Sequence, residues 1–300
     1  MIFSKDITTI FITRRHIRAA VFSTKGRAKT EVQTYVWDKE NIDVVLKEIF
    51  SNGPKEVRVV FGEEFSYVTA VPIGKKNREE IRRSAQEIIP EKLENNWDFK
   101  KEKSSETQFQ VAAIKPEIFE FFQKKFKESG LKIEAIEPQS VSLARVLPER
   151  GLALFMCEDD DKILLGAVSD STLETAQITS EGNVTADFRR FREYVKKKFS
   201  KDPSVVFVGP KMNMSAGTFV DKDIEIRSFN PDPLRAVAIK ENISGADWQV
   251  MNIDPENISI TPEKEISGES NFSKREIILA IIFIGGLLAA GAFIYWKKFH

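Results

Sequence analysis

Short runs of β-branched and aromatic residues alternate along the chain with stretches whose apolar residues recur at helical spacing. Three runs rich in Ile, Val, Thr and Phe open the chain and predict strands. An amphipathic stretch ended by Asn52-Gly53-Pro54 then predicts a helix, and "EVRVVFG" predicts a buried strand. The predicted strands are 6–13, 16–24, 28–36 and 56–62, and the predicted helix is 40–51.

The following segment predicts a smaller strand and helix unit. The run "FSYVTAVPI" predicts a strand that stops at Pro72. Asn77 is expected to cap a helix with Glu80 as its capping-box partner, and Pro90 breaks that helix. Its expected apolar face consists of Ile81, Ala85, Ile88 and Ile89. A polar patch follows at 100–107.

Four further elements complete the first half. They are a strand at 107–114, a helix at 116–129 closed by Gly130, a strand at 131–138 and a short helix at 139–147. The second half then repeats the order of the first. The elements that follow are predicted at 152–157, 162–168, 172–178, 185–200 and 204–209. Both halves thus contain three strands, a helix and a strand, and this repetition predicts a duplicated α/β domain.

The C-terminal run "IILAIIFIGGLLAAGAFIYW", from Ile277 to Trp296, contains no charged residue. Twenty helical residues span about 30 Å, the thickness of a bilayer's hydrocarbon core. We therefore predict a membrane helix at 276–297 after a polar linker at 251–275; a buried core helix is the alternative. This run also contains pairs of small residues four apart, through which two membrane helices could pack together. A homodimer is therefore an open alternative; the pairs are Gly285 with Ala289 and Gly286 with Ala290.

Composition narrows the chemistry. The 45 basic and 45 acidic residues cancel, so nothing in the overall charge suggests a nucleic acid partner. A single cysteine, Cys157, excludes an intrachain disulfide, and two histidines make a His-based zinc site an unfavourable hypothesis. The N-terminus lacks the pattern of a signal peptide, so we expect a cytoplasmic main body attached to the inner membrane by a single pass.

Two charged features could bind a ligand. The stretch "CEDDDK" places Glu158, Asp159, Asp160 and Asp161 between two apolar strands. A calcium loop needs alternating ligands and a glycine, which this stretch lacks, so a solvated hairpin turn is the preferred interpretation. The predicted helix 185–200 carries Arg and Lys around an apolar face and is interpreted as a solvated helix, with an anionic lipid surface as the alternative.

The order of the elements and the sequence of two segments add a family resemblance. The order of elements is that of the actin/Hsp70/hexokinase fold. The segments "VTAVPIGKKNREEIRRSAQEIIPEKLENNWDF" and "QFQVAAIKPEIFEFFQKKFKESGLKIEAIEPQSVSLARVL" resemble two consecutive blocks of the type IV pilus protein PilM. The resemblance covers roughly 55–147 well. It implies an actin-like, bilobed domain at 1–250 with an inserted subdomain at about 65–115. A C-terminal membrane helix is a feature of the type II secretion relative GspL.

The resemblance also implies partners. The family would make this chain a scaffold among PilN/PilO- or GspM-like platform proteins, next to the cytoplasmic assembly ATPase. The stretch "QVMNIDPENI" resembles the PilN peptide "INLLP" that docks on PilM, so we expect it to bind in cis; an ordinary last strand is the alternative. The residues of this expected peptide are Met251, Asn252, Ile253, Asp254 and Pro255.

The nucleotide motifs of the fold depart from the family pattern. ATP-binding members hold phosphates with two Asp-x-Gly hairpins, which would fall on Phe11-Ile12-Thr13, followed by Arg14, and on Met156-Cys157-Glu158. A Gly-Gly pair for adenosine is replaced by Gly209-Pro210. We therefore expect a pseudo-ATPase without cofactor or metal. The alternatives are an actin-fold ATP-binding protein or ATPase with drifted motifs, and a tail-anchored adaptor unrelated to pili.

Overall fold

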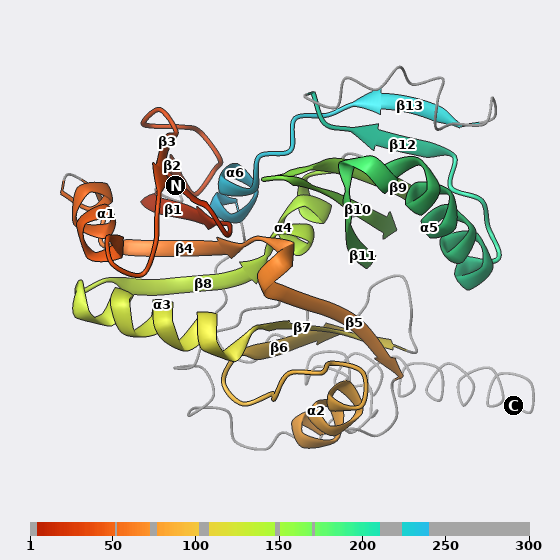
Figure 1. Cartoon of the computed structure of the whole chain (residues 1–300), viewed down its shortest axis with the longest axis horizontal. Coiled ribbons are helices and arrows are strands. Elements are labelled where there is room, and N and C mark those ends of the chain that lie inside the picture. Colours follow the sequence, from red (N-terminus) through yellow and green to blue (C-terminus); the bar gives the residue numbers. More distant parts are fainter. Residues whose placement is uncertain are drawn as a thin grey trace, which may run out of the picture. The chain divides into compact units, whose positions relative to one another are not determined.

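The computed structural model describes residues 5–51, 53–72, 77–101, 108–147, 151–169, 172–210 and 224–239. All of them belong to the first of two compact units, Met1–Lys264. They form two five-stranded sheets, one three-stranded sheet and the helices that cover them (Figure 1). The first sheet contains β1 (Asp6–Ile12), β2 (His16–Ser23), β3 (Gln33–Val36), β4 (Glu56–Phe61) and β8 (Lys132–Pro138).

The second five-stranded sheet repeats the first. Its strands are β9 (Leu152–Asp159), β10 (Lys162–Ser169), β11 (Thr172–Ser180), β12 (Val205–Val208) and β13 (Glu225–Ser228). The spatial orders are β3-β2-β1-β4-β8 and β11-β10-β9-β12-β13. In each sheet the first three strands form an antiparallel meander and the last two run parallel to the first. This topology confirms the duplication predicted from the sequence.

Helices provide the crossovers that parallel strands require. α1 (Ile42–Ile49) connects β3 to β4, and α5 (Val184–Phe199) connects β11 to β12 in the second sheet. The apolar side chains of α5 recur at helical spacing and are buried: Val184, Phe188, Phe191 and Val195. α3 (Pro116–Glu128) precedes β8 and buries Phe119, Phe122 and Phe126 in the same way.

The third sheet lies in the segment expected to form an inserted subdomain. It contains β5 (Ser66–Pro72), β7 (Gln108–Ile114) and β6 (Trp97–Lys101), in the order β5-β7-β6. α2 (Arg78–Gln86) begins with the predicted capping box of Asn77 and Glu80. The strand β6 reaches into the polar patch that begins at residue 100. One expectation is wrong here: Ile88 is 57% exposed and does not belong to the buried face of α2. α2 ends at Gln86, and Ile89 is the residue that the following turn buries.

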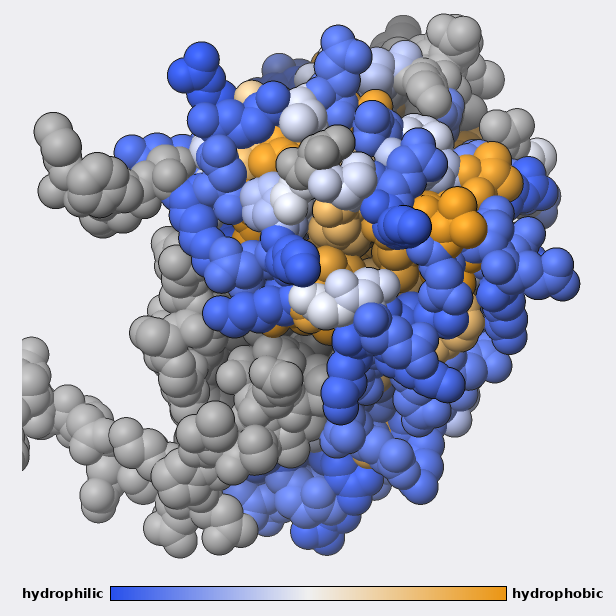
Figure 2. Space-filling view, turned by 90° about the vertical axis from the view of Figure 1, so that its left-hand side faces the viewer, coloured by the Kyte–Doolittle hydropathy of each residue, from blue (hydrophilic) through white to orange (hydrophobic). Residues whose placement is uncertain are grey.

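Hydrophobic side chains reach the surface on the left-hand face of Figure 1, which carries α1 and β3 (Figure 2). Val36 on β3 and Val44 on α1 are about two-thirds exposed or more, at 71% and 67%. β3 is also the edge strand of the first sheet. Nothing in the described residues covers these two side chains.

Two short helices pack across the two repeats. α4 (Gln139–Val146) follows the first sheet but also packs against β10 and β11 of the second. α6 (Pro233–Ala238) follows the second sheet and packs against β1, β2 and β4 of the first. The two helices also contact each other. The sequence analysis did not identify β13 or α6.

Two arginines anchor the C-terminal end of α6. Arg58 on β4 is 2% exposed, and its Nη1 donates to the carbonyl oxygens of Val237 at 3.1 Å and Ala238 at 2.7 Å. Its Nε lies 3.3 Å from the Glu134 carboxylate. Arg145 on α4 donates to the Ala236 carbonyl oxygen at 3.0 Å and forms a two-pronged ion pair with Glu137. These contacts satisfy carbonyl groups that a helix end leaves without partners.

Within the part of the chain that the structure describes, none of the helices combines the length and apolar character needed to cross a bilayer. The predicted linker at 251–275 and the predicted membrane helix at 276–297 lie outside the described residues.

Replacing the buried guanidinium should loosen the contact between the two repeats. We expect Arg58→Met to lower the free energy of unfolding by about 3 kcal/mol, because two carbonyl groups and one carboxylate lose a buried donor. Urea denaturation measures the change. Arg83→Met is the matched control: Arg83 is 69% exposed on α2, and we expect a change within about 0.5 kcal/mol. Equal effects of the two substitutions would contradict the anchoring role of Arg58.

Candidate functional site

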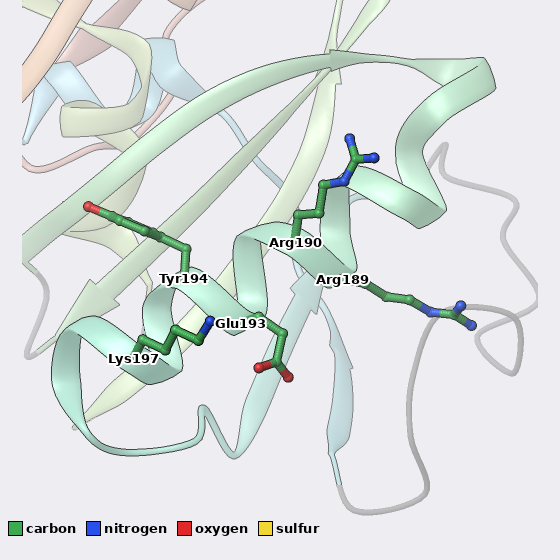
Figure 3. Close-up of a pocket in the computed structure, with 5 residues that line it drawn as sticks. All are labelled: Arg189, Arg190, Glu193, Tyr194 and Lys197. Atoms are coloured by element: carbon green, nitrogen blue, oxygen red, sulfur yellow. The ribbon is translucent and has the colours of Figure 1, made fainter.

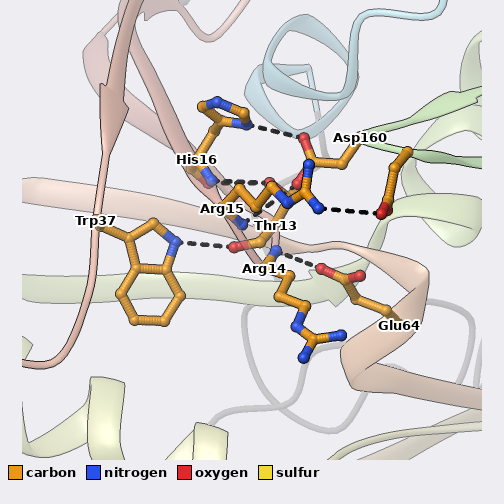
Figure 4. Close-up of polar contacts among 8 residues, drawn as sticks. Thr13, Arg14, Arg15, His16, Trp37, Glu64 and Asp160 are labelled. Carbon is orange, nitrogen blue, oxygen red and sulfur yellow. Dashed lines mark hydrogen bonds and ion pairs between the residues drawn. The ribbon is translucent and has the colours of Figure 1, made fainter.

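The turns of two equivalent hairpins meet in the structure. The β1–β2 turn carries Arg15 and leads into His16, and the β9–β10 turn carries Asp160 and Asp161. His16 Nδ1 lies 3.0 Å from Asp160 Oδ1, and Arg15 Nη2 lies 3.3 Å from Asp161 Oδ2 (Figure 4). The backbone N–H of Arg15 also donates to Asp160 Oδ2 at 3.3 Å. A basic turn of the first repeat is therefore joined to an acidic turn of the second.

The first turn is fixed by hydrogen bonds of its own. The Thr13 N–H donates to the His16 carbonyl oxygen at 2.9 Å, and the His16 N–H donates to the Thr13 hydroxyl at 3.1 Å. Trp37 Nε1 donates to the Thr13 carbonyl oxygen at 2.8 Å. Thr13 is 2% exposed, so these bonds also satisfy groups that water does not reach. The turn is held in one conformation before it meets its partner.

The second turn aims a carboxylate at the first. Asp159 is the last residue of β9 and pairs with Lys162 in the strand register, and Asp160 and Asp161 contact the first turn. Asp160 has a φ of 52°, in the left-handed region that Asp tolerates better than most residues. Burial by itself would raise the pKa of the Asp160 carboxyl, but hydrogen bonds from Thr13, His16 and the Arg15 backbone outweigh it and lower that pKa. The charged form is therefore favoured in the folded protein.

A third turn adds two more carboxylates. Glu64 follows β4 and accepts a hydrogen bond from the Arg14 N–H, and Lys162 lies 4.0 Å from it. The neighbouring Glu63 is buried and accepts from the Ser140 N–H at 3.1 Å and the Ser140 hydroxyl at 2.7 Å. Burial raises the pKa of Glu63 to about 7, even though both Ser140 hydrogen bonds oppose the rise.

The backbone donors of the first turn consequently have protein partners. The N–H groups of Arg14, Arg15 and His16 donate to Glu64, Asp160 and Thr13 respectively. Two of these three acceptors are carboxylates contributed by other turns. The N–H groups are arranged as in an anion-binding site, but the groups that accept their hydrogen bonds are side chains of the same chain.

The remaining predicted site residues lie apart from this contact. Phe11 is 2% exposed in β1, with the Arg18 guanidinium 4.6 Å from its ring centroid. Glu158 is partly buried near the end of β9, opposite Ile163. The Gly209 N–H donates to the Met156 carbonyl oxygen at 2.9 Å, and the exposed Pro210 follows. The expected peptide, Met251 to Pro255, and the expected membrane residues lie outside the described part of the chain.

As whole residues Asp160 and Asp161 are exposed, as a solvated hairpin turn predicts, but their carboxylates also contact the first turn. Each turn, taken alone, indicates a hydrated surface loop, but the fold brings Arg15 and His16 against Asp160 and Asp161. A sequence signal for this pairing does exist: two equivalent hairpins carry turns of opposite charge. Glu63 and Glu64 were not identified as part of the contact. Across the described residues, no cluster of three or more His, Cys, Asp or Glu side chains could hold a metal ion.

Removing the better buried carboxylate should weaken the contact between the turns. Asp160→Asn is expected to lower the free energy of unfolding by about 1 kcal/mol at pH 7, because the charged acceptor is lost while the left-handed backbone remains tolerated. Since the folded-state pKa of Asp160 is lowered, its contribution is present above its ordinary pKa and is lost as the pH falls through the folded value. The difference between wild type and variant should therefore shrink in acid.

Asp161→Asn is the matched control for this measurement. The Arg15–Asp161 pair is more than half exposed on both sides, so the substitution should change the free energy of unfolding by less than about 0.5 kcal/mol. Urea denaturation between neutral pH and acid measures both variants. A larger effect of Asp161→Asn than of Asp160→Asn would contradict the assignment of Asp160 as the principal contact.

Glu63 should make stability depend on pH in the opposite direction. Its folded-state pKa of about 7 lies above the ordinary value of 4.5, so the folded state binds the proton more tightly than the unfolded state. The free energy of unfolding should then fall by about 3 kcal/mol as the pH rises from below 4.5 to above 7. Glu63→Gln should flatten this fall, measured as the slope against pH in urea denaturation. An unchanged slope would exclude Glu63 as its source.

Comparisons with known proteins address the fold. The sequence matches no protein-family profile and no curated protein. The structure is similar to the cytoplasmic domain of EpsL, an inner membrane component of the type II secretion system of Vibrio cholerae, with a TM-score of 0.60 and 12% identity. That similarity covers 83% of this chain and 98% of the EpsL domain.

Two further solved structures agree. A chain of the PilM–PilN type IV pilus biogenesis complex gives a TM-score of 0.59 at 12% identity, over 77% of this chain and 89% of that one. A Bacteroides thetaiotaomicron protein with an actin-like ATPase fold gives 0.50 at 14% identity, over 79% of this chain and 96% of that one. The prediction from the sequence is confirmed at the level of architecture: the described domain has the actin-like fold shared by the EpsL cytoplasmic domain and PilM.

Proposed function

We propose that the chain is a non-catalytic scaffold in the inner-membrane platform of a type IV pilus or type II secretion machine, where it links cytoplasmic components to the membrane. The fold supports this proposal, because two of the similar structures are an inner membrane component of a secretion system and a pilus biogenesis protein in complex with PilN. The segment at roughly 55–147, whose sequence resembles two consecutive blocks of PilM, also supports it.

The contact between the two hairpins is the observation that carries the non-catalytic part of the proposal. Nucleotide-binding members of this fold use the hairpin N–H groups to hold phosphates. In this chain the Arg14 and Arg15 N–H groups donate to Glu64 and Asp160. A phosphate entering this place would have to displace those carboxylates or lie beside them. Each like-charge contact at 4 Å costs about 1 kcal/mol in water and more at partly buried positions.

The residues at the expected adenosine element agree with this interpretation. The Gly209 N–H is already used by the Met156 carbonyl oxygen. A Cβ at position 209 would lie 3.3 Å from the Cβ of Cys157, so a larger residue would force this neighbour on β9 to shift by a few tenths of an ångström. Close packing on β9 therefore accounts for a glycine at this position without a ligand. The runner-up, an ATPase with drifted motifs, has no observation of this kind in its favour.

The proposed partners follow from the same similarities. A PilN-like protein is proposed as a partner because a similar structure is a complex with PilN. PilO- or GspM-like platform proteins and the cytoplasmic assembly ATPase complete the expected surroundings. The stretch 251–255 is proposed as an internal PilN-like segment on the basis of its sequence.

Nucleotide binding separates the scaffold from the ATPase. We expect 1 mM MgATP to leave the unfolding temperature of the full chain unchanged, with equimolar magnesium sulfate as the ionic control. A site with a Kd of about 10 μM would add about 2.7 kcal/mol and raise the midpoint by several degrees. Saturable, micromolar binding of a fluorescent ATP analogue, abolished in Glu158→Ala, would overturn the non-catalytic assignment.

Deletion of the gene tests the proposed role in a pilus or secretion machine. Loss of surface pili or of secreted proteins, restored by the full chain, is expected. Restoration by the Asp161→Asn variant is expected as well, because a scaffold does not depend on an exposed carboxylate in a degenerate phosphate turn. Unchanged piliation and secretion in the deletion strain would reject the platform role, whatever the outcome of the nucleotide experiment.

A further inference from the structure

The outward face of α5 is a basic surface that also carries an exposed tyrosine. The opposite side of the helix buries Val184, Phe188, Phe191 and Val195 against the second sheet. The outward side forms an open hollow (Figure 3). The side chains that line this hollow, which we call the α5 basic face, are Arg189, Arg190, Glu193, Tyr194 and Lys197.

Ion pairing leaves part of this positive charge uncompensated. Arg192 and Lys196 share Asp202, at 3.0 Å and 3.1 Å, and Arg190 lies 3.4 Å from Asp187. Arg189 and Lys197 have no ion-pair partner among the described residues. Glu193 is the one acid on the α5 basic face itself, where it accompanies three basic residues. The face therefore presents net positive charge to its surroundings.

Tyr194 gives the face a second property. Its side chain is 51% exposed, and it belongs to a small group of exposed large hydrophobic residues in the described part of the chain. The other members are valines and an isoleucine on different elements, Val32, Val36, Val44 and Ile88. Only Tyr194 stands among guanidinium and ammonium groups. A tyrosine surrounded by basic side chains is the combination found where proteins contact the headgroup level of a bilayer.

We propose that the α5 basic face docks on an anionic lipid surface. Arg189, Arg190 and Lys197 would donate to lipid phosphates, and the Tyr194 ring would lie at headgroup depth with its hydroxyl hydrated. This inference rests on the membrane attachment included in the proposed function. A random-coil segment as long as the predicted linker, 251–275, would reach about 28 Å and would keep the domain at high effective concentration beside a bilayer.

The shape of the face favours a lipid surface over an acidic protein segment. The hollow lies on the outside of a single helix and is open. A peptide would gain little burial there, whereas a plane of headgroups can meet all the cations at once without a fitted pocket. Charge alone does not distinguish the two occupants, so the experiment includes both.

The test uses the full chain in lipid nanodiscs with an environment-sensitive dye. Ala186 is exposed one turn before Arg189 and Arg190, and the native Cys157 is buried, so a cysteine introduced by Ala186→Cys is the site that a thiol dye labels. Ser129→Cys at the exposed C-terminal end of α3 is the matched label position. Nanodiscs contain phosphatidylcholine alone or with about 30% phosphatidylglycerol.

The dye at position 186 should brighten and shift to the blue in anionic discs and not in neutral ones. The response should vanish in about 0.5 M salt, where surface charges are screened. Arg189→Gln with Lys197→Gln should reduce the ratio of docked to undocked chain about thirtyfold. Lys124→Gln with Lys127→Gln, which removes the same charge from α3, should leave that ratio unchanged, and the dye at position 129 should not respond.

Three outcomes would contradict the inference, and each has its own meaning. If the chain co-elutes with both kinds of disc but the dye at position 186 does not distinguish them, the docking inference is wrong while membrane attachment stands. If the chain does not co-elute with discs, the proposed membrane attachment fails as well. If soluble polyglutamate changes the dye emission and anionic discs do not, the face binds an acidic protein segment and the lipid assignment is overturned.

Discussion

The exchange of α4 and α6 between the two repeats is the constraint on which the rest of the structure depends. A helix of six residues such as α6 is not stable alone, because helix nucleation is too costly for so short a segment. α6 is stabilised by the sheet of the other repeat and by two arginines that donate hydrogen bonds to its last carbonyl groups. Arg58 comes from β4 and Arg145 from α4, so one helix end joins three elements.

The meeting of the hairpins follows from this anchoring. Asp160 and His16 are separated by 144 positions in sequence, and the contact between their repeats brings them together. The interactions are graded by burial: the guanidinium of Arg58 is buried, the carboxylate of Asp160 is mostly buried, and the Arg15–Asp161 pair is exposed. Because exposed pairs contribute little, the exposed pair adds complementarity while the buried contacts hold the two repeats together.

The sequence predicts the regular part of this architecture well, for physical reasons. β4 and β9 are largely apolar runs, β1 is rich in Ile and Thr, and α3 and α5 have apolar stripes at helical spacing, so composition and periodicity identify them. β13 has four residues and α6 has six, too few for a period to be recognised. The pairing of Arg15 with Asp161 could not be derived because periodicity reports a residue's own element and not which distant turn it meets. Ile88 fits the helical period of α2, but the helix ends two residues before it.

The acidic turn of the hairpin contact and the α5 basic face belong to the same repeat and are linked through β10. The acidic turn leads directly into β10, and α5 packs against β10 and β11 from the side. In a nucleotide-binding member of this fold, the relative placement of the repeats would depend on what lies between the hairpins. In this chain the buried contacts of Arg58 and Arg145 and the His16–Asp160 contact join the two repeats, so contacts within the chain set the orientation of α5 relative to the first repeat. A fixed orientation is what the proposed docking of the α5 basic face on a lipid plane requires.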